Sequence, residues 1–406
     1  MANQNGLYAM SKHAMIETEV GYIPEDWEVV NLGKIGPFYK GAGISREDSH
    51  SGSIPAVRYG ELYTIHNNYI FKCTSFISPQ IAKQSRRMRK GYILFTGSGE
   101  TKEDIGKAVA FLHDYEAYAG GDLIILSPKK SYDSLYLGYI LNSSSVIRQR
   151  TSMAQGDSVV HITADALKEL HIPLPPTKDE QTRIASALYD IDTLIRNLDR
   201  TIEKKKNIRQ GAMEELLSGK RKAKGYNSLW RECELSEIIN VVKGVQKNGS
   251  ELLDKGPYPM INGGVIPSGY TTEYNTNADT ITISEGGNSC GYVNYVHQKF
   301  WAGGHCYCVI IRKPNEIEKE FLFHLLKYNE KIIMSLRVGS GLPNIQSKIL
   351  LEMQVYYPTD IKEQQAIADT LTAMDDEIAT LQLERDKYAN IRSGMMDALL
   401  SGIKRM

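Results

Sequence analysis

Several features that mark particular classes of protein are missing from this sequence. No apolar run approaches the roughly 20 residues that a membrane-spanning helix needs, and we expect no membrane partner. The opening residues, MANQNGLYAM, lack the apolar core of a secretory signal peptide, so we expect a cytoplasmic protein. The five cysteines include no CxxC pair. His305, Cys306 and Cys308 alternate along a strand-like run, HCYCVII, which we interpret as ordinary reduced cysteines without a metal.

Catalytic motifs are missing as well. The Gly106-Lys107 pair lacks the rest of a phosphate-binding loop, and neither GxSxG nor HExxH occurs. The segment from Phe95 to Gly99 fits the short FxGxG pattern with which some methyltransferases hold S-adenosylmethionine. No Asn/Asp-Pro-Pro-aromatic motif accompanies it, and the second copy of this region does not keep the pattern. We therefore expect no catalytic residue and no cofactor in this chain, and favour a binding function.

An excess of positive charge, frequent in nucleic-acid-binding domains, is also absent. The chain has 48 basic and 48 acidic residues and a formal net charge of zero. The basic residues are unevenly placed, however, and one such run alone is most simply a solvated face. Two clusters stand out: Arg86, Arg87, Arg89 and Lys90, and then Lys204, Lys205, Lys206, Arg209, Lys220, Arg221, Lys222 and Lys224.

What the sequence does contain is an internal repeat. EQTRIASAL begins at Glu180 and EQQAIADTL at Glu363, an offset of 183 residues. The same offset relates IRQGAMEELLSG from Ile208 to IRSGMMDALLSG from Ile391, and HITADALKELHIPLP from His161 to NIQSKILLEMQVYYP from Asn344. Earlier parts agree in outline only: GYIPEDWEVVNLGKI resembles GYNSLWRECELSEI, with Trp27 opposite Trp230, and AYAGGDLIIL resembles FWAGGHCYCVI. The repeat indicates helices that do one job twice and globular parts that share a fold but contact different things.

Two long helices are predicted from apolar residues that step by four and three. They begin after Pro175-Pro176 and Pro358 and end at Ser218-Gly219 and Ser401-Gly402. A globular region lies between them, so we expect them to pack as an antiparallel coiled coil. The predicted seam consists of Ile184, Leu188, Ile191, Ile195, Leu198, Ile202, Ile367, Leu371, Met374, Ile378 and Leu381.

The globular parts are predicted to be mixed α/β (α+β), giving a pseudo-two-fold molecule of two similar domains separated by the helices. Strands are expected at 91–96, 122–126, 280–284 and 307–311, and helices at 134–142 and 319–328. We expect domain boundaries at 13–175, 176–222 (central helix), 223–358 and 359–406 (C-terminal helix).

This order of parts resembles the DNA-specificity subunit of type I restriction–modification enzymes. The resemblance is carried by GYIPEDWEVVNL, by the helix openings EQTRIASALYDID and EQQAIADTLTAMDDEI, and by the helix ends NIRQGAMEELLSGKRK and NIRSGMMDALLSGIKR. It implies two target-recognition domains that read the halves of a split, asymmetric site in double-stranded DNA. It also implies partners: two methyltransferase subunits that use S-adenosylmethionine, docked on the helices, and a translocating nuclease subunit. The neutral net charge departs from this picture, and residues 1–12 have no place in it.

Candidate DNA contacts follow from side-chain chemistry, because phosphates favour Lys and Arg whereas base edges favour polar side chains on loops. Across the repeat, IPAVRYG from Ile54 matches YPMINGG from Tyr258, which places Arg58 opposite Asn262. The first domain offers Arg58, Tyr59, Arg86, Arg87, Arg89, Lys90, Ser98, Glu100, Thr101 and Lys102. The second offers Asn262, Glu285, Asn288, Ser289, Arg337, Ser340 and Asn344.

Three alternatives stay open at this point. The chain could be the specificity subunit of a related system with a fused nuclease–methyltransferase. It could be a coiled-coil scaffold joining two protein-binding domains. It could also be an orphan adenine methyltransferase, which the missing motif disfavours.

Overall fold

The computed structural model describes residues 14–156, 159–339, 341 and 343–406. The chain divides into two compact units, which we call the first unit (Met1–Asn197 and Arg385–Met406) and the second unit (Leu198–Glu384). Each unit combines a globular part with part of both long helices. Among the described residues no helix has the length and apolarity needed to cross a membrane.

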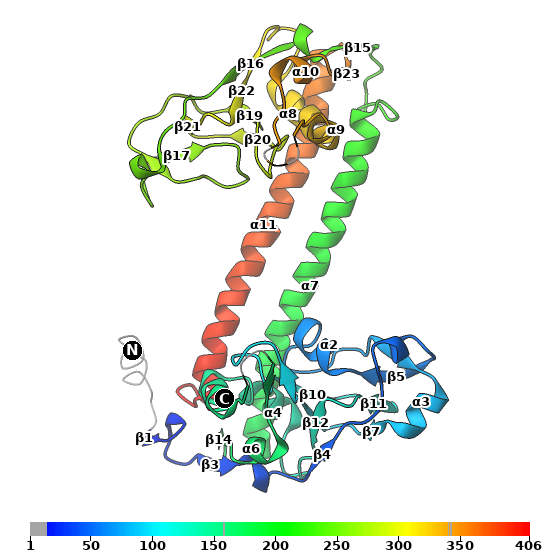
Figure 1. Cartoon of the computed structure of the whole chain (residues 1–406), viewed down its shortest axis with the longest axis vertical. Helices are drawn as coiled ribbons and strands as arrows, with labels where there is room; N and C mark the ends of the chain where they lie inside the picture. Colours follow the sequence, from blue (N-terminus) through cyan, green and yellow to red (C-terminus); the bar gives the residue numbers. More distant parts are fainter. Residues whose placement is uncertain (1–13, 157–158, 340, 342) are drawn as a thin grey trace. The chain divides into compact units, whose positions relative to one another are not determined.

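The long helices are α7 (Lys178–Leu217) and α11 (Ile361–Leu400), which keep the 183-residue offset at both ends (Figure 1). Each is followed by a glycine with positive φ, Gly219 at +73° and Gly402 at +72°, a conformation that favours glycine at the end of a helix. In the second unit Lys205 pairs with Glu377 at 2.6 Å and Arg209 with Asp375 at 2.9 Å. The residue numbers of the partners on α11 fall as those on α7 rise, and this confirms the predicted antiparallel packing.

Every predicted seam position is buried or half-buried, but the seam has two kinds of partner. Ile184 and Leu188 belong to the main core of the first unit, together with residues of its sheet. Ile367 and Leu371 belong in the same way to the core of the second unit. The opening turns of each helix are therefore anchored in a globular core, and that core also contains the end of the other helix, Leu399 and Leu400 in the first unit and Leu216 and Leu217 in the second.

In the first unit, short strands and helices precede α7. They are β1 (Met15–Thr18), β2 (Gly21–Pro24), β3 (Glu28–Asn31), β4 (Phe38–Lys40), β5 (Ile54–Val57), α2 (Tyr59–Thr64), β6 (Ser75–Ile77), α3 (Pro79–Gln84), β7 (Arg86–Met88), β8 (Ile93–Thr96), β9 (Ser98–Gly99), β10 (Ala108–Ala110), β11 (Ala117–Ala119), β12 (Leu123–Leu126), α4 (Ser134–Ile140), α5 (Ser144–Met153), β13 (Val160–His161), α6 (Ala164–Lys168) and β14 (His171–Leu174).

In the second unit the elements between the long helices are β15 (Trp230–Glu234), β16 (Ile239–Lys243), β17 (Tyr258–Ile261), β18 (Tyr270–Thr271), β19 (Thr280–Ser284), β20 (Val293–Val296), β21 (Trp301–Ala302), β22 (Cys306–Ile311), α8 (Lys319–Tyr328), α9 (Glu330–Ser335), α10 (Ser347–Leu351) and β23 (Gln354–Pro358). The predicted strands and helices of both globular parts are present, within a few residues of their expected limits. The mixed α/β prediction is therefore confirmed.

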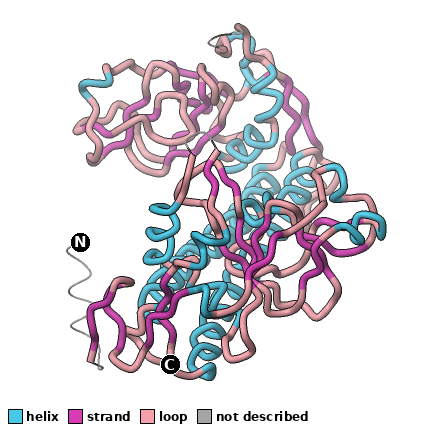
Figure 2. Tube along the Cα trace, turned by 60° about the horizontal axis from the view of Figure 1, so that its bottom comes forward, coloured by secondary structure: helices cyan, strands magenta, loops and turns pink. Residues whose placement is uncertain are grey.

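The main sheets of the two units repeat one strand order. It is β10-β8-β12-β4 in the first unit and β20-β19-β22-β16 in the second, antiparallel throughout. A second, smaller sheet is also common to both units, because β5 runs parallel to β11 in the first unit and β17 runs parallel to β21 in the second. The first unit adds β7 to this second sheet and carries α2 and α3 beside it. In both units the strands, magenta in Figure 2, form short ladders joined by long loops.

Alternation along the strands builds a core on each face of the main sheet. In the first unit Ile93 and Phe95 face the helical core, whereas Leu94 faces the second sheet. In the second unit Ile283 faces the helical core, whereas Cys306 and Cys308 pack in a smaller cluster with β17 and β21. Each globular part is therefore a sheet covered by helices on one side and by a small sheet on the other.

A glutamine repeated near the start of each long helix fixes that helix to its globular part. Gln181 Nε2 donates to the Pro175 carbonyl at 3.4 Å, and its Oε1 accepts from the backbone N–H of Asp133 at 2.9 Å, at the start of α4. Gln364 makes the equivalent bonds to Pro358 at 2.8 Å and Glu318 at 2.8 Å, at the start of α8. The repeated glutamine therefore makes equivalent contacts in both units.

Candidate nucleic-acid interface

One cluster of exposed loops has the same backbone frame in both units. In the first unit β9 pairs with β13, and His161 also pairs through its backbone with Gln155. Ser98 Oγ lies 3.0 Å from Nδ1 of the exposed His161, and the Tyr63 hydroxyl donates to the Ser98 carbonyl at 2.7 Å. Burial raises the pKa of Tyr63, so this hydroxyl remains a donor at neutral pH. Ser98, a predicted contact, is thus held in a defined position.

In the second unit Asn344 pairs through its backbone with both Gly286 and Val338. The offset of 183 maps Asn344 onto His161 and Val338 onto Gln155. The loops that side-chain chemistry selects independently in each half therefore occupy the same place in the repeat. The second copy brings Glu285, Arg337 and Asn344 into one neighbourhood, and the last two are exposed. Exposed polar side chains on a fixed frame are suited to hydrogen bonding with a base edge.

Two predicted contacts of the second unit converge on His305, a residue that the sequence analysis weighed for a metal but did not select as a DNA contact. Asn262 Oδ1 accepts the His305 N–H at 3.0 Å, and Glu285 Oε2 lies 3.2 Å from His305 Nδ1. Glu285 Oε1 accepts from Lys243 Nζ at 2.6 Å. A signal was present in the sequence, because His305 follows the Gly-Gly pair that both copies share and stands opposite Asp122 of the first copy.

Arg58 lies at the start of α2, just after β5, as Asn262 lies just after β17, so the predicted equivalence holds at the level of the strands. Its Nε is 3.3 Å from Ser75 Oγ and 3.4 Å from Glu61 Oε1. The side chain of Glu61 is almost fully buried, whereas that of Arg58 is 27% exposed. Arg58 is therefore anchored at one end, while the neighbouring Tyr59 is exposed.

The basic cluster of the first unit lies on and beside β7, where all four cations are exposed. Arg86 donates to the Lys40 carbonyl at 3.2 Å, and Arg87 lies 3.6 Å from Glu116. Lys90 pairs with Asp114 at 2.9 Å. Exposed pairs of this kind contribute little, about 0 to 1 kcal/mol, so the cations can exchange them for phosphates at low cost.

The remaining predicted contacts lie on turns of the same loops. Thr101 Oγ1 donates to Asp104 Oδ2 at 2.8 Å, and the Lys102 carbonyl accepts from Thr151 at 3.1 Å. Glu100 and Lys102 are exposed, as is Asn288, whereas Ser289 is half-buried. Ser340 lies outside the described residues.

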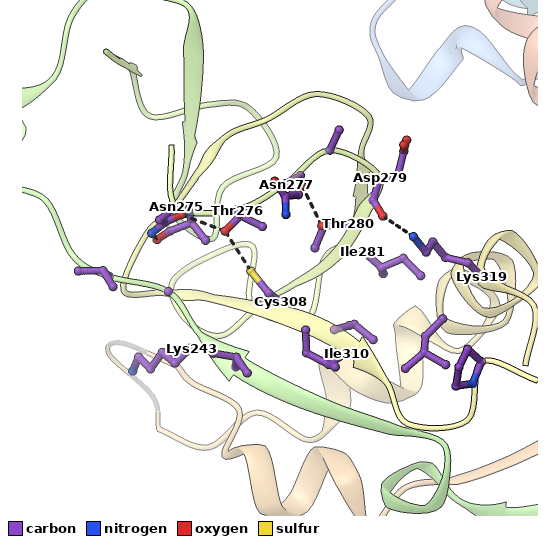
Figure 3. Close-up of a pocket in the computed structure, with 18 residues that line it drawn as sticks. Lys243, Asn275, Thr276, Asn277, Asp279, Thr280, Ile281, Cys308, Ile310 and Lys319 are labelled. Atoms are coloured by element: carbon purple, nitrogen blue, oxygen red, sulfur yellow. Dashed lines mark hydrogen bonds between the residues drawn. The ribbon is translucent and has the colours of Figure 1, made fainter. Parts of the chain in front are cut away.

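The second unit also has a pocket of about 640 Å³ beside its main sheet. Figure 3 shows Lys243 and Lys319 at opposite sides of it, with Asn275 and Thr276 on the side of Lys243. Lys319 donates to the Asp279 carbonyl at 3.2 Å, and Thr276 Oγ1 lies 3.9 Å from Cys308 Sγ. Because Lys243 also pairs with Glu285, this pocket borders the loop cluster.

Two segments were considered above for a cofactor or a metal, FxGxG and HCYCVII, and the structure shows what surrounds their side chains. Phe95 of the FxGxG segment is fully buried and stacks on Phe38, with ring centroids 6.2 Å apart. Cys306 and Cys308 are free and buried; the neighbouring Cys308 and burial raise the pKa of Cys306. Within the described ranges, no three His, Cys, Asp or Glu side chains are grouped so that they could hold a metal ion.

Comparison with known proteins agrees with this architecture. The family model for the type I restriction modification DNA specificity domain matches the chain twice, at residues 24–207 and 227–390. The MjaVIII specificity subunit of Methanocaldococcus jannaschii is 24% identical over 94% of this chain and 93% of its own length. A putative type I specificity subunit of Mycoplasma genitalium is 28% identical over 61% of this chain and 66% of its own length.

The fold is also found among solved structures. A crystal structure of a type I restriction–modification S subunit from M. genitalium superposes with a TM-score of 0.68, at 22% identity, over 92% of this chain and 96% of the other. A chain from a study of complex assembly in the type I system gives a TM-score of 0.54, at 15% identity, over 94% and 99%. With the family model matching once in each repeat, this chain belongs to the type I restriction–modification DNA specificity family.

Proposed function

We propose that this chain reads a split DNA site, one half-site with each unit, and holds two methyltransferase subunits on its repeated helices. Specificity subunits are the non-catalytic recognition components of type I enzymes, so the chemistry belongs to partner chains. The observation that carries the proposal is the loop cluster, which has one backbone frame and different side chains in the two units. The first unit presents Ser98 and His161 where the second presents Gly286 and Asn344. One frame with two sets of side chains suits two half-sites of different sequence.

Phosphate contacts and base contacts come from different elements in this proposal. The exposed cations on and beside β7 neutralise phosphates, which gives affinity without sequence preference. Arg58 and the exposed loop residues reach base edges in the major groove, which gives the choice of sequence. A net charge of zero over the whole chain is compatible with this division, because local clusters rather than total charge meet the DNA.

The helix ends offer two equivalent docking surfaces. Ile208 is 49% exposed on α7 and Ile391, its repeat partner, is 41% exposed on α11. The helix surface around Gly211 and Gly394 is open, because a Cβ added at either glycine would meet no atom within 4 Å. The arginine beside each isoleucine is held across the helix pair, Arg209 by Asp375 and Arg392 by Asp192.

An apolar residue exposed twice at equivalent positions suits two copies of one partner. We infer that the partner is the methyltransferase, which brings S-adenosylmethionine and flips the target base out of the stack. A translocating nuclease subunit joins this complex for cleavage. A related system with a fused nuclease–methyltransferase would use the same two surfaces.

Single-molecule methylome sequencing of cells that express this chain with its methyltransferase tests the proposal. We expect methylated adenines in one motif made of two specified parts and an unspecified gap, with one adenine in each part on opposite strands. A contiguous motif, or random methylation, would contradict the proposal that each unit reads one half-site. Failure of the chain to shift duplex DNA even with the methyltransferase present would favour a protein scaffold instead.

A further inference from the structure

We propose that His305 determines specificity in the second unit by accepting a hydrogen bond from an exocyclic amine, N6 of adenine or N4 of cytosine. The inference deepens the proposed function and rests on it, since it assumes that the second unit reads a half-site. It replaces direct reading by Glu285 and Asn262 with positioning: both residues hold His305, and His305 meets the base.

The backbone of His305 is fixed from both sides. Its N–H donates to Asn262 Oδ1 at 3.0 Å, and its carbonyl accepts from the Glu285 N–H at 2.9 Å. Gly263, with φ of +82°, approaches so closely that an added Cβ would lie 2.6 Å from the His305 carbonyl oxygen. These contacts leave the residue little freedom before any ligand arrives, as a reading group requires.

The side chain of His305 points outward from this fixed backbone. It is 59% exposed, whereas the carboxylate of Glu285 beside it is only 13% exposed. Nδ1 lies 3.2 Å from Glu285 Oε2, and Lys243 Nζ pairs with the other carboxylate oxygen at 2.6 Å. One end of the imidazole is therefore tied down, and Nε2 is the end left for a ligand.

The pairing also decides which ring nitrogen carries the proton. An ionised carboxylate can only accept hydrogen bonds, and Lys243 is the counter-ion of Glu285. Nδ1 of the neutral ring must therefore carry the hydrogen, which leaves Nε2 as an acceptor. In the major groove adenine and cytosine offer an amine donor, whereas guanine offers two acceptors and thymine one acceptor and a methyl group. His305 therefore selects adenine or cytosine at one position.

The same argument does not extend to the first unit. His161 is also exposed and also held through Nδ1, but its partner is the hydroxyl of Ser98 at 3.0 Å. A hydroxyl can donate or accept, so neither tautomer of His161 is imposed. The proposal is for this reason confined to the second half-site.

Methylome sequencing with the full chain and its methyltransferase tests the assignment. His305→Ala should admit all four bases at one position of one half-site, reducing its preference at least tenfold and leaving every other position unchanged. His305→Arg, a donor, should shift that position to guanine. Glu285→Ala should loosen the same position, less completely, because the imidazole loses its anchor.

His297 supplies the matched control. It is exposed and its Nδ1 lies 3.2 Å from Asp279 Oδ1, the same kind of pair at a different place in the unit. His297→Ala should leave the motif intact. An unchanged motif in both His305 variants, or a change in the other half-site, would overturn the inference. If the unaltered chain directs no sequence-specific methylation, the proposed function itself fails.

Discussion

The two copies of the repeat agree in one region and diverge in another, and the boundary lies at α6 and α10. From Ala164 and Ser347 onward the offset is 183 through β14 and β23 to the last residue of α7 and α11. Before that boundary the copies agree in strand order, in the helix pair α4 and α8, and in the backbone frame around His161 and Asn344. They differ elsewhere, because the first unit places α2, α3 and β7 where the second has a loop with β18. The agreeing region makes the same contacts twice, whereas the diverging region keeps a frame and changes its side chains. Under the proposed function, the agreeing region binds the same partner twice, whereas the diverging region contacts two different half-sites.

The largest expected effect comes from the region that agrees. Ile208→Asp and Ile391→Asp each place a charge on one proposed docking surface, where desolvation would oppose binding. The double variant should bind the methyltransferase at least a hundredfold more weakly, and each single variant should lose one of two bound copies. Mass photometry of the complex measures the number of copies.

Leu229, which is 83% exposed in the second unit and lies outside the helices, provides the control. Leu229→Asp should leave two copies bound. Loss of both copies in one single variant, or of neither in the double variant, would break the equivalence of the two surfaces.

The two equivalent Arg–Asp ion pairs should differ in strength because the burial of their aspartates differs. Asp192 is 13% exposed and also accepts from the Tyr139 hydroxyl at 2.7 Å, whereas Asp375 is 42% exposed. Removing one partner of a buried pair is costly, so Arg392→Ala should destabilise the first unit by about 2 kcal/mol. Arg209→Ala should destabilise the second unit by about 1 kcal/mol or less. Urea unfolding measures both, and an equal loss would show that burial does not set the difference.

Acid should weaken each unit through a histidine that the repeat does not share. Burial lowers the pKa of His66 in the first unit and of His324 in the second to about 4. An unfolded histidine has a pKa of about 6.5, so the unfolded state binds protons first as the pH falls. Each of these histidines leaves the free energy of unfolding undiminished above about pH 6.5. It lowers that free energy progressively as the pH falls toward 4, by roughly 2 kcal/mol per histidine at pH 5.

Chemical denaturation at pH 7 and pH 5 measures this loss. His324→Gln should flatten the pH dependence of the second unit and leave that of the first. A pH dependence that survives in the second unit would assign the loss to other groups.

The long helices were the most predictable part of the molecule. An apolar step of four and three, bounded by proline and by Ser-Gly, specifies a helix from local sequence alone, and α7 and α11 end as expected. Strands such as β19 could be predicted because a short run of β-branched residues favours an extended conformation. The partner of a strand could not, because the parallel pairing of β5 with β11 joins segments about 60 residues apart.

The candidate site could be predicted only in part, for a similar reason. Chemistry selects Glu285 and Asn262 as polar loop residues, but their shared partner His305 follows from tertiary contact. The anchoring of Arg58 by Glu61 also depends on Ser75, which lies on another strand.

A smaller effect is expected from the diverging region, where β7 has no counterpart in the second unit. Arg86→Ala, Arg87→Ala and Arg89→Ala together should weaken binding to all DNA sequences alike. The slope of log affinity against log salt should fall by about one for each phosphate that is no longer neutralised. Fluorescence anisotropy over a salt series measures it, and the exposed pair Lys129→Ala and Lys130→Ala serves as a control that removes two charges elsewhere in the first unit. A change in motif rather than in slope would mean that these arginines read bases.

The central claim, that two units joined by α7 and α11 read two half-sites at a fixed spacing, has one direct test. Four residues inserted after Glu203 in α7 and four after Leu383 in α11 lengthen the stretch between the ion pairs Asp192–Arg392 and Arg209–Asp375. The added helix is about 6 Å long, and DNA rises about 3.4 Å per base pair. Methylome sequencing should show the gap longer by one or two base pairs, with the same bases on either side. An unchanged gap, or new half-site bases around the old gap, would contradict the account.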